Sequence, residues 1–149
     1  MMRLIENKKA LFDYEVLEKL EAGIELLGFE VKSIRGQRGS LNGAYVSVKG
    51  GQVFLIGAHI PPFQPNNTPS NYDPYRERKL LLTKGEIRSL IGREKAKGLT
   101  IIPISVYNRK NKIKVEIAVA RGKKKYDKRA VIKKRETERE IRRLKHQRF

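Results

Sequence analysis

The residue types that most often carry out chemistry are scarce in this chain. It contains no cysteine and only two histidines, His59 and His146. His59 lies in an apolar stretch, as half-buried histidines often do, and His146 lies among charged residues near the C-terminus. The sequence shows no Ser/His/Asp pattern, phosphate-binding loop or HExxH motif, and its carboxylates are not clustered as metal ligands would be. We therefore expect a protein that is not an enzyme and needs no metal or other cofactor.

Lysine and arginine are abundant instead. The chain has 34 of them against 16 aspartate and glutamate residues, for a formal net charge of +18. So many positive charges repel one another, and a protein with such a surplus usually binds a polyanion. Nucleic acid is the commonest such partner, because neutralising phosphates releases counterions. An anionic membrane surface and a surface tuned only for solubility are the alternatives.

The charge is concentrated at the C-terminal end. Residues 121–149 contain 14 Lys/Arg and 4 Asp/Glu, so the last fifth of the chain carries more than half of the excess. A block of this kind usually acts as an interaction tail. We therefore expect a binding domain over residues 1–120 and a basic tail over residues 121–149.

Length and composition are those of one small globular unit. The chain has 149 residues, of which 39% are hydrophobic and 34% are charged. It has no apolar run long enough to span a membrane, and its N-terminus lacks the apolar segment of a secretory signal. We expect a cytoplasmic, monomeric protein without a membrane partner.

Two β-hairpins are predicted in the middle of the chain. Residues 44–48 and 53–56 are rich in β-formers, and Gly50-Gly51 between them is typical of a tight turn that needs positive φ. The second hairpin joins residues 99–107 to residues 113–120. Its return strand alternates, so we expect one buried face (Ile113, Val115, Ile117 and Val119) and one face in water.

The remaining segments are less regular. Residues 13–21 fit either a helix or a strand, and we expect one strand and one short helix within the glycine-punctuated first 43 residues. Residues 61–75, rich in Pro and Asn, predict a long loop that is functional or mobile. A short strand at 79–82 precedes a helix with a capping box, Thr83-Lys84-Gly85-Glu86, ended by Gly98.

These elements predict a mainly β protein with flanking helices, built as a small β-barrel. A barrel of this size has a filled interior, so binding must use its outer surface and loops.

Helix-forming residues dominate the tail, but its apolar residues make no continuous stripe that could dock on a core. We expect a tail that is disordered when free and becomes helical on RNA, where phosphates offset the repulsion between its cations. A stable solvent-exposed helix is the alternative.

Three strings in the sequence resemble the SsrA-binding protein family, also called small protein B. They are Glu-Val-Lys-Ser-Ile-Arg at 30–35, Arg-Lys-Leu-Leu-Leu at 78–82 and Ala-Arg-Gly-Lys-Lys-Lys-Tyr-Asp-Lys-Arg at 120–129. The similarity runs in order from about residue 7 to about residue 144. It implies an oligonucleotide-binding-like β-barrel that holds the tRNA-like domain of transfer-messenger RNA. It also implies delivery of that RNA to stalled ribosomes for trans-translation, with the tail acting in the decoding region of the small subunit.

The resemblance also implies site residues. Its barrel positions for RNA binding fall on Glu21, Leu81 and Thr83, the last standing where relatives carry Asn, and its strings add Arg35, Lys79, Lys123 and Lys124. The Asp-Lys-Arg motif of the tail falls on Asp127, Lys128 and Arg129, and the expected ribosome-binding set continues through Ile132, Lys133, Lys134 and Arg135.

Glu21 is an unusual residue for a phosphate-binding surface. It could accept hydrogen bonds from base edges or orient a neighbouring arginine, and a solvated surface glutamate is the plain alternative. A structural ribosomal protein with a basic extension is the main competing function. An RNA-processing enzyme would need a metal site that the sequence does not supply.

Overall fold

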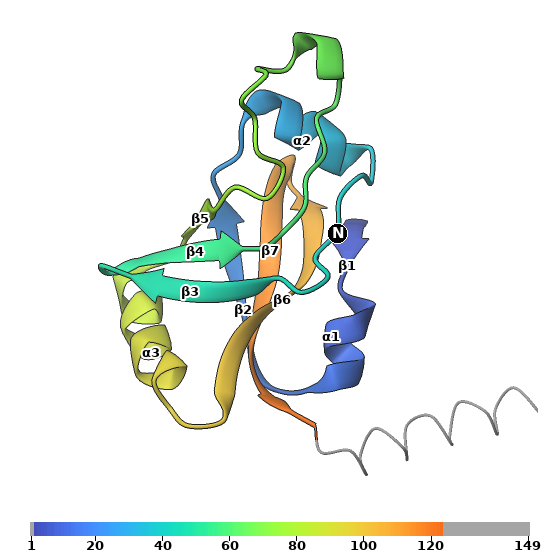
Figure 1. Ribbon diagram of the computed structural model, residues 1–149. Coiled ribbons are helices and arrows are strands. Elements are labelled where there is room, and N and C mark those ends of the chain that lie inside the picture. The colour runs from blue at the N-terminus through green and yellow to red at the C-terminus, as the bar shows by residue number, and fades with distance from the viewer. Residues whose placement is uncertain (1, 124–149) are drawn as a thin grey trace, which may run out of the picture.

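The computed structural model describes residues 2–123 (Figure 1). Seven strands and three α-helices make up most of this part of the chain. In order they are β1 (Met2–Glu6), α1 (Lys8–Asp13), β2 (Tyr14–Ile24), α2 (Gly28–Arg35), β3 (Tyr45–Lys49), β4 (Gln52–Ile56), the 3-10 turn η1 (Pro65–Asn67), β5 (Arg78–Leu81), α3 (Lys84–Glu94), β6 (Leu99–Arg109) and β7 (Lys112–Gly122).

The strands form one antiparallel sheet in the order β1-β6-β7-β2-β5-β4-β3. The sheet curls so that β3, at one end of this order, packs against β6 near the other end. In Figure 1 the β3–β4 hairpin crosses in front of the long β6–β7 hairpin, with α2 above the sheet and α1 and α3 on either side below. The predicted mainly β fold with flanking helices is confirmed.

Both predicted hairpins are present. Gly50 and Gly51 have φ of 56° and 75°, as a tight turn between β3 and β4 requires. In the second hairpin Lys110 and Asn111 take up positive φ, and the strands extend to Arg109 and Gly122, beyond the predicted ends. The turn is therefore two residues long rather than five.

The ambiguous N-terminal segment forms the long strand β2, and the short helix expected nearby is α2. This segment forms a strand rather than a helix because it pairs with β7 from Tyr14 to Gly23. Strand β1 and helix α1 were not predicted. Asn7 holds them in place, because its side chain caps α1 and also donates to the carbonyl of Pro103 at 2.9 Å.

The predicted two-sided character of β7 is only half right. Val115, Ile117 and Val119 lie in the main core, as expected. Ala118 and Ala120, on the face expected to meet water, are buried as well, because α1 covers them in a second cluster with Ile102 and Ile104. Small side chains there leave room for the helix, so this face of β7 is covered at Ala118 and Ala120, while Lys114 and Glu116 before them are partly exposed.

Helix α3 begins where its capping box predicts. The Thr83 hydroxyl accepts from the Glu86 N–H, and the Glu86 carboxylate accepts from the Thr83 N–H at 2.9 Å. Leu90 is fully buried, with Ile87 packed beside it on the core. The helix ends at Glu94, four residues before the predicted stop at Gly98.

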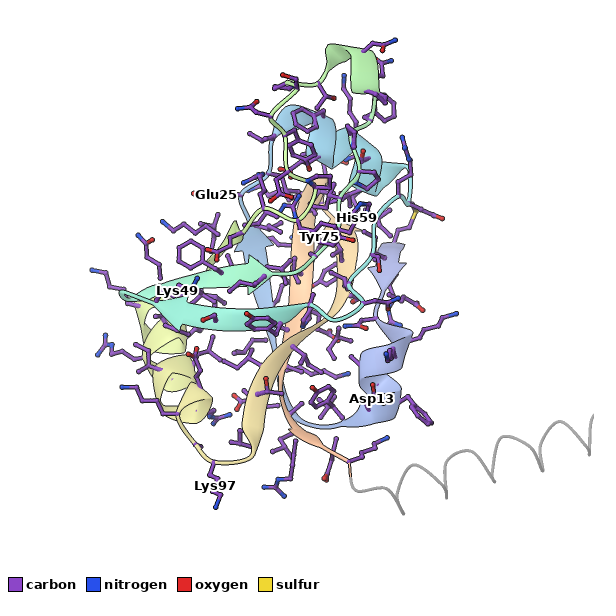
Figure 2. All side chains as sticks on the ribbon, in the orientation of Figure 1. Asp13, Glu25, Lys49, His59, Tyr75 and Lys97 are labelled. Atoms are coloured by element: carbon purple, nitrogen blue, oxygen red, sulfur yellow. The ribbon has the colours of Figure 1, made fainter. Side chains whose placement is uncertain are left out.

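The loop over residues 61–75 is tied to the domain at several points. The Ile60 N–H donates to the Pro74 carbonyl at 3.0 Å, and the Ser33 hydroxyl on α2 donates to the Pro61 carbonyl at 2.6 Å. His59, two residues before this loop, is half-buried as predicted and packs its ring against that of Tyr75 at the end of the loop (Figure 2).

Candidate nucleic-acid interface

Directly paired residues on neighbouring strands point to the same face of a sheet, so the register fixes which side chains share the outer surface. One row crosses four strands: Tyr107 on β6 pairs with Lys114 on β7, Lys114 with Gly23 on β2, and Gly23 with Leu81 on β5. The row lies on the outer face, because Val115, the next residue along β7, points into the core. It places an apolar end at Leu81 and a cation at Lys114 on one continuous surface.

Leu81 is unusually exposed for a leucine in a strand, at 48% of its surface. Its partner is a glycine, and a Cβ built at Gly23 would lie 3.2 Å from Leu81 Cβ. The absence of a side chain at Gly23 therefore lets Leu81 lie over the neighbouring strand while remaining accessible.

A pocket of about 370 Å³ adjoins this row, between the ends of β2 and β5, helix α2 and the β6–β7 turn. Leu81 and Arg35 line it, together with Lys112 and Lys114. Arg35, at the end of α2, also donates to the Asn111 carbonyl at 3.0 Å, which links the helix to the turn. Two of the predicted site residues, far apart in sequence, thus share one depression with two further cations.

Glu21 lies two residues before Gly23 on the same face of β2. Its carboxylate accepts hydrogen bonds from the Tyr107 hydroxyl and from Arg109 Nη1, the latter at 2.7 Å. These two bonds, of which the one from Tyr107 has the larger effect, hold the pKa of Glu21 below its ordinary value. The carboxylate is therefore an anion at neutral pH. Burial is the main cause that raises the pKa of Tyr107, and the hydrogen bond to Glu21 raises it further. Glu21 therefore contacts a neighbouring arginine, as one of the two roles considered from sequence requires.

Lys79 extends the surface along β5, since it lies two residues before Leu81 on the same face. It lines a second depression of about 430 Å³ with Phe54, its partner on β4, and Arg76. Leu26 lines both depressions, so that they adjoin. We call the combined surface, formed by Glu21, Arg35, Lys79, Leu81, Arg109, Lys112 and Lys114, the β2–β5 face.

Two predicted residues line neither depression. Thr83, two residues after Leu81, is exposed and uses its hydroxyl and its N–H to cap α3. Lys123 follows the far end of β7, seven residues and roughly 23 Å beyond Glu116, the partner of Glu21. There its N–H donates to the Asp13 carbonyl at 2.9 Å and its Nζ to the Leu11 carbonyl at 3.2 Å. Lys124 and the tail residues Asp127, Lys128, Arg129, Ile132, Lys133, Lys134 and Arg135 lie outside the described residues.

Tyr107, Arg109, Lys112 and Lys114 were not singled out from sequence. Alternation within the predicted second hairpin already placed Lys114 on the face opposite Val115. The two-residue turn then sets Arg109 against Lys112 and Tyr107 against Lys114. Neither Lys112 nor Lys114 lies within ion-pair distance of a carboxylate of residues 2–123, although the charge of Lys114 helps to lower the pKa of Glu21. Both ammonium groups can therefore approach an external anion.

Within residues 2–123, no three His, Asp or Glu side chains are grouped so that they could hold a metal ion. None of the helices in that range is long and apolar enough to cross a membrane.

Comparison with known proteins agrees with the resemblance noted in the sequence. The SsrA-binding protein of Syntrophobacter fumaroxidans is 51% identical over 147 residues, which cover 98% of this chain and 91% of that protein. The SsrA-binding protein of Thermosipho melanesiensis is 52% identical, covering 95% of this chain and 97% of the relative.

A chain in a solved structure described as "tmRNA-SmpB: a journey to the center of the bacterial ribosome" matches with a TM-score of 0.68. It is 42% identical, and the match covers 81% of this chain and 85% of the other. The family model described as "SmpB protein" matches residues 4–147. The chain therefore belongs to the SmpB protein family.

Proposed function

We propose that this protein is an RNA-binding adaptor that binds the tRNA-like domain of transfer-messenger RNA and delivers it to stalled ribosomes for trans-translation. The observation that carries the proposal is the row from Leu81 to Tyr107, which places an exposed leucine and the cation of Lys114 on one surface. The relatives support it, since they are named SsrA-binding proteins and the matched chain is described with tmRNA and the ribosome.

The chemistry of the β2–β5 face fits a folded RNA. Lys112 and Lys114 supply phosphate contacts, which set affinity and its salt dependence. Leu81 offers an apolar contact to an unstacked base, as in RNA recognised through splayed loop nucleotides. Arg109 donates to Glu21 through Nη1 alone, which leaves the other donors of its guanidinium for a contact with RNA.

The basic tail, residues 121–149, has a separate role in this proposal: it contacts small-subunit RNA in the decoding region. Asp127 directly precedes a helix-forming run and would cap a helix there, while Lys128 and Arg129 in its first turn need a nearby anion to offset the helix dipole. Phosphates of ribosomal RNA supply that anion. The protein acts throughout by binding, in the cytoplasm, as a monomer and without a cofactor.

Two assays on the full chain test the proposal. The tRNA-like domain of transfer-messenger RNA should bind more tightly than an unrelated RNA duplex at matched salt, and equal affinity would contradict specific recognition. The combined variant Asp127→Ala, Lys128→Ala and Arg129→Ala should keep this affinity and lose tagging of nascent chains on stalled ribosomes. Normal tagging by the variant would contradict the role of the tail.

A further inference from the structure

A buried ionic cluster lies directly behind the β2–β5 face. Glu30 on α2 and Arg78, the first residue of β5, are both 0% exposed although 48 residues separate them. Arg78 donates from Nε and Nη2 to Glu30 Oε2 at 3.0 and 2.6 Å. Arg76, which is partly exposed, donates to both oxygens of the same carboxylate.

The Arg78 guanidinium also binds three segments that approach it from the loops. Its Nη1 donates to the Ala58 carbonyl at 2.7 Å, and its Nη2 donates to the Pro74 carbonyl at 2.9 Å and the Tyr72 oxygen at 3.0 Å. Glu30 in turn accepts from the Leu27 N–H at 2.8 Å. One ion pair thus joins the start of α2, the end of β4, the long loop and the start of β5.

This ion pair contributes little to stability, but it fixes the relative positions of the segments that it joins. Desolvating two charges costs several kcal/mol, and apolar groups of equal volume often stabilise a fold as well or better. Burial raises the pKa of Glu30, yet the bonds from Arg76, Leu27 and Arg78 outweigh it and leave the pKa below its ordinary value. The carboxylate is therefore ionised, and a planar guanidinium with five donors fixes the direction of each partner.

The elements joined by the cluster are the two walls of the pocket on the β2–β5 face. Helix α2 carries Arg35 five residues after Glu30, and β5 carries Lys79 and Leu81 one and three residues after Arg78. Arg35 and Leu81 line the same pocket. A rotation of α2 about its start would move Arg35 away from Leu81 and from the β6–β7 turn.

We propose that the Glu30–Arg78 pair is a positioning device for RNA recognition: it fixes α2 and β5 so that Arg35 and Leu81 present one surface. This inference rests on the proposed function. Neither residue touches RNA, since both are fully buried, so their effect on binding passes through the residues that they hold.

The test replaces the ion pair by apolar side chains of similar length, Glu30→Met with Arg78→Met, in the full chain. Net charge is unchanged, and Arg76 can turn towards solvent. Urea unfolding first establishes that the variant is folded under the binding conditions. We then expect affinity for the tRNA-like domain to fall at least tenfold and affinity for an unrelated duplex to change less than twofold.

A second readout does not depend on RNA. Since the chain has no cysteine, cysteines introduced at Lys32 on α2 and Ser89 on α3, both exposed, accept spin labels without other changes. The distance distribution between the labels should be narrow in the parent and broad in the double-methionine variant. A control pair at Lys19 on β2 and Ser89 should stay narrow in both.

A folded variant with unchanged affinity or an unchanged Lys32–Ser89 distribution would overturn the positioning role. If the double variant does not fold, Tyr72→Phe is the deciding test. It keeps the ring packed on Phe29 and removes only the hydroxyl, which accepts from Arg78 and lies 2.8 Å from both Glu30 Oε2 and the Ile60 carbonyl oxygen. We expect Tyr72→Phe to weaken binding of the tRNA-like domain several-fold, and wild-type binding would overturn the inference. Failure of the unmodified protein to prefer that RNA would instead overturn the proposed function.

Discussion

Leu81 lies across Gly23: the two residues are paired in the ladder between β2 and β5, and a Cβ at Gly23 would come within 3.2 Å of Leu81 Cβ. Leu81→Ala should leave the fold intact and weaken RNA binding. Since nearly half of the side chain is free to be buried on RNA, we expect a loss of about 1 kcal/mol, or roughly fivefold in affinity.

The matched control is Leu17, which is 45% exposed against 48% for Leu81. It lies on β2 six residues before Gly23, roughly 20 Å away along the strand. Leu17→Ala should bind the tRNA-like domain as the parent does in a filter-binding or anisotropy titration. Equal losses for the two variants would remove Leu81 from the interface.

Glu21→Gln tests whether the carboxylate orients Arg109. The amide keeps the shape of the side chain and can still accept from Tyr107, but it no longer pairs with the guanidinium as an ion. Affinity for the tRNA-like domain should fall roughly tenfold, about 1.4 kcal/mol, while affinity for an unrelated duplex holds or rises.

Glu116→Gln is the control for the change in charge, because Glu116 pairs directly with Glu21 on the next strand but contacts Lys19, at 3.7 Å, rather than Arg109. Both variants remove one negative charge from the same face. If they affect RNA selectivity alike, Glu21 acts only as a surface charge.

Features that depend on residues close together in the sequence were predicted correctly, whereas features that depend on distant residues were not. The Gly50-Gly51 turn and the Thr83–Glu86 capping box depend on residues within one turn of the chain, and both were predicted. The long loop was found from its Pro and Asn content, but its attachment to α2 was not, because it depends on partners distant in sequence.

The site depended on register, which a single strand does not reveal. Glu21, Arg35 and Leu81 came from the family resemblance, and no local pattern joins them. Their common surface appears only when β2 is paired with β7 and β5. The burial of Ala118 and Ala120 was not predicted for the same reason, since the helix that covers them lies more than a hundred residues earlier in the sequence.

Lys112 and Lys97 provide a test of the electrostatics of the β2–β5 face. Lys112 begins β7 beside the pocket, whereas Lys97 precedes β6 at the opposite end of the domain (Figure 2). Lys112→Gln should reduce the slope of log affinity against log salt by about one, because one phosphate contact is lost. Lys97→Gln should leave the slope unchanged, and equal slopes for the two variants would contradict the placement of the interface.

The Glu30 cluster predicts a defined response to acid. The folded pKa of Glu30 lies below its ordinary value of 4.5, so its contribution to stability is complete above that pH and is lost as pH falls through the folded pKa. Within that window the free energy of unfolding should drop by up to about 1.4 kcal/mol per pH unit from this group.

The comparison with Glu30→Met/Arg78→Met isolates this effect, because the variant lacks the titrating carboxylate. Urea unfolding of both proteins at neutral pH and at steps below pH 4.5 should show the difference in stability shifting in favour of the variant as pH falls. A difference that does not change with pH would mean that folding does not shift the pKa of Glu30.

Crosslinking from position 81 tests the central claim most directly. A photoreactive amino acid in place of Leu81, in the full chain, would be activated in bacterial lysate and the attached RNA sequenced, with position 17 as the matched site. We predict that transfer-messenger RNA dominates the crosslinks from position 81, within its tRNA-like domain, and that position 17 captures little of it. Crosslinks from position 81 spread over ribosomal and transfer RNA, or the same RNA captured equally from position 17, would contradict the account.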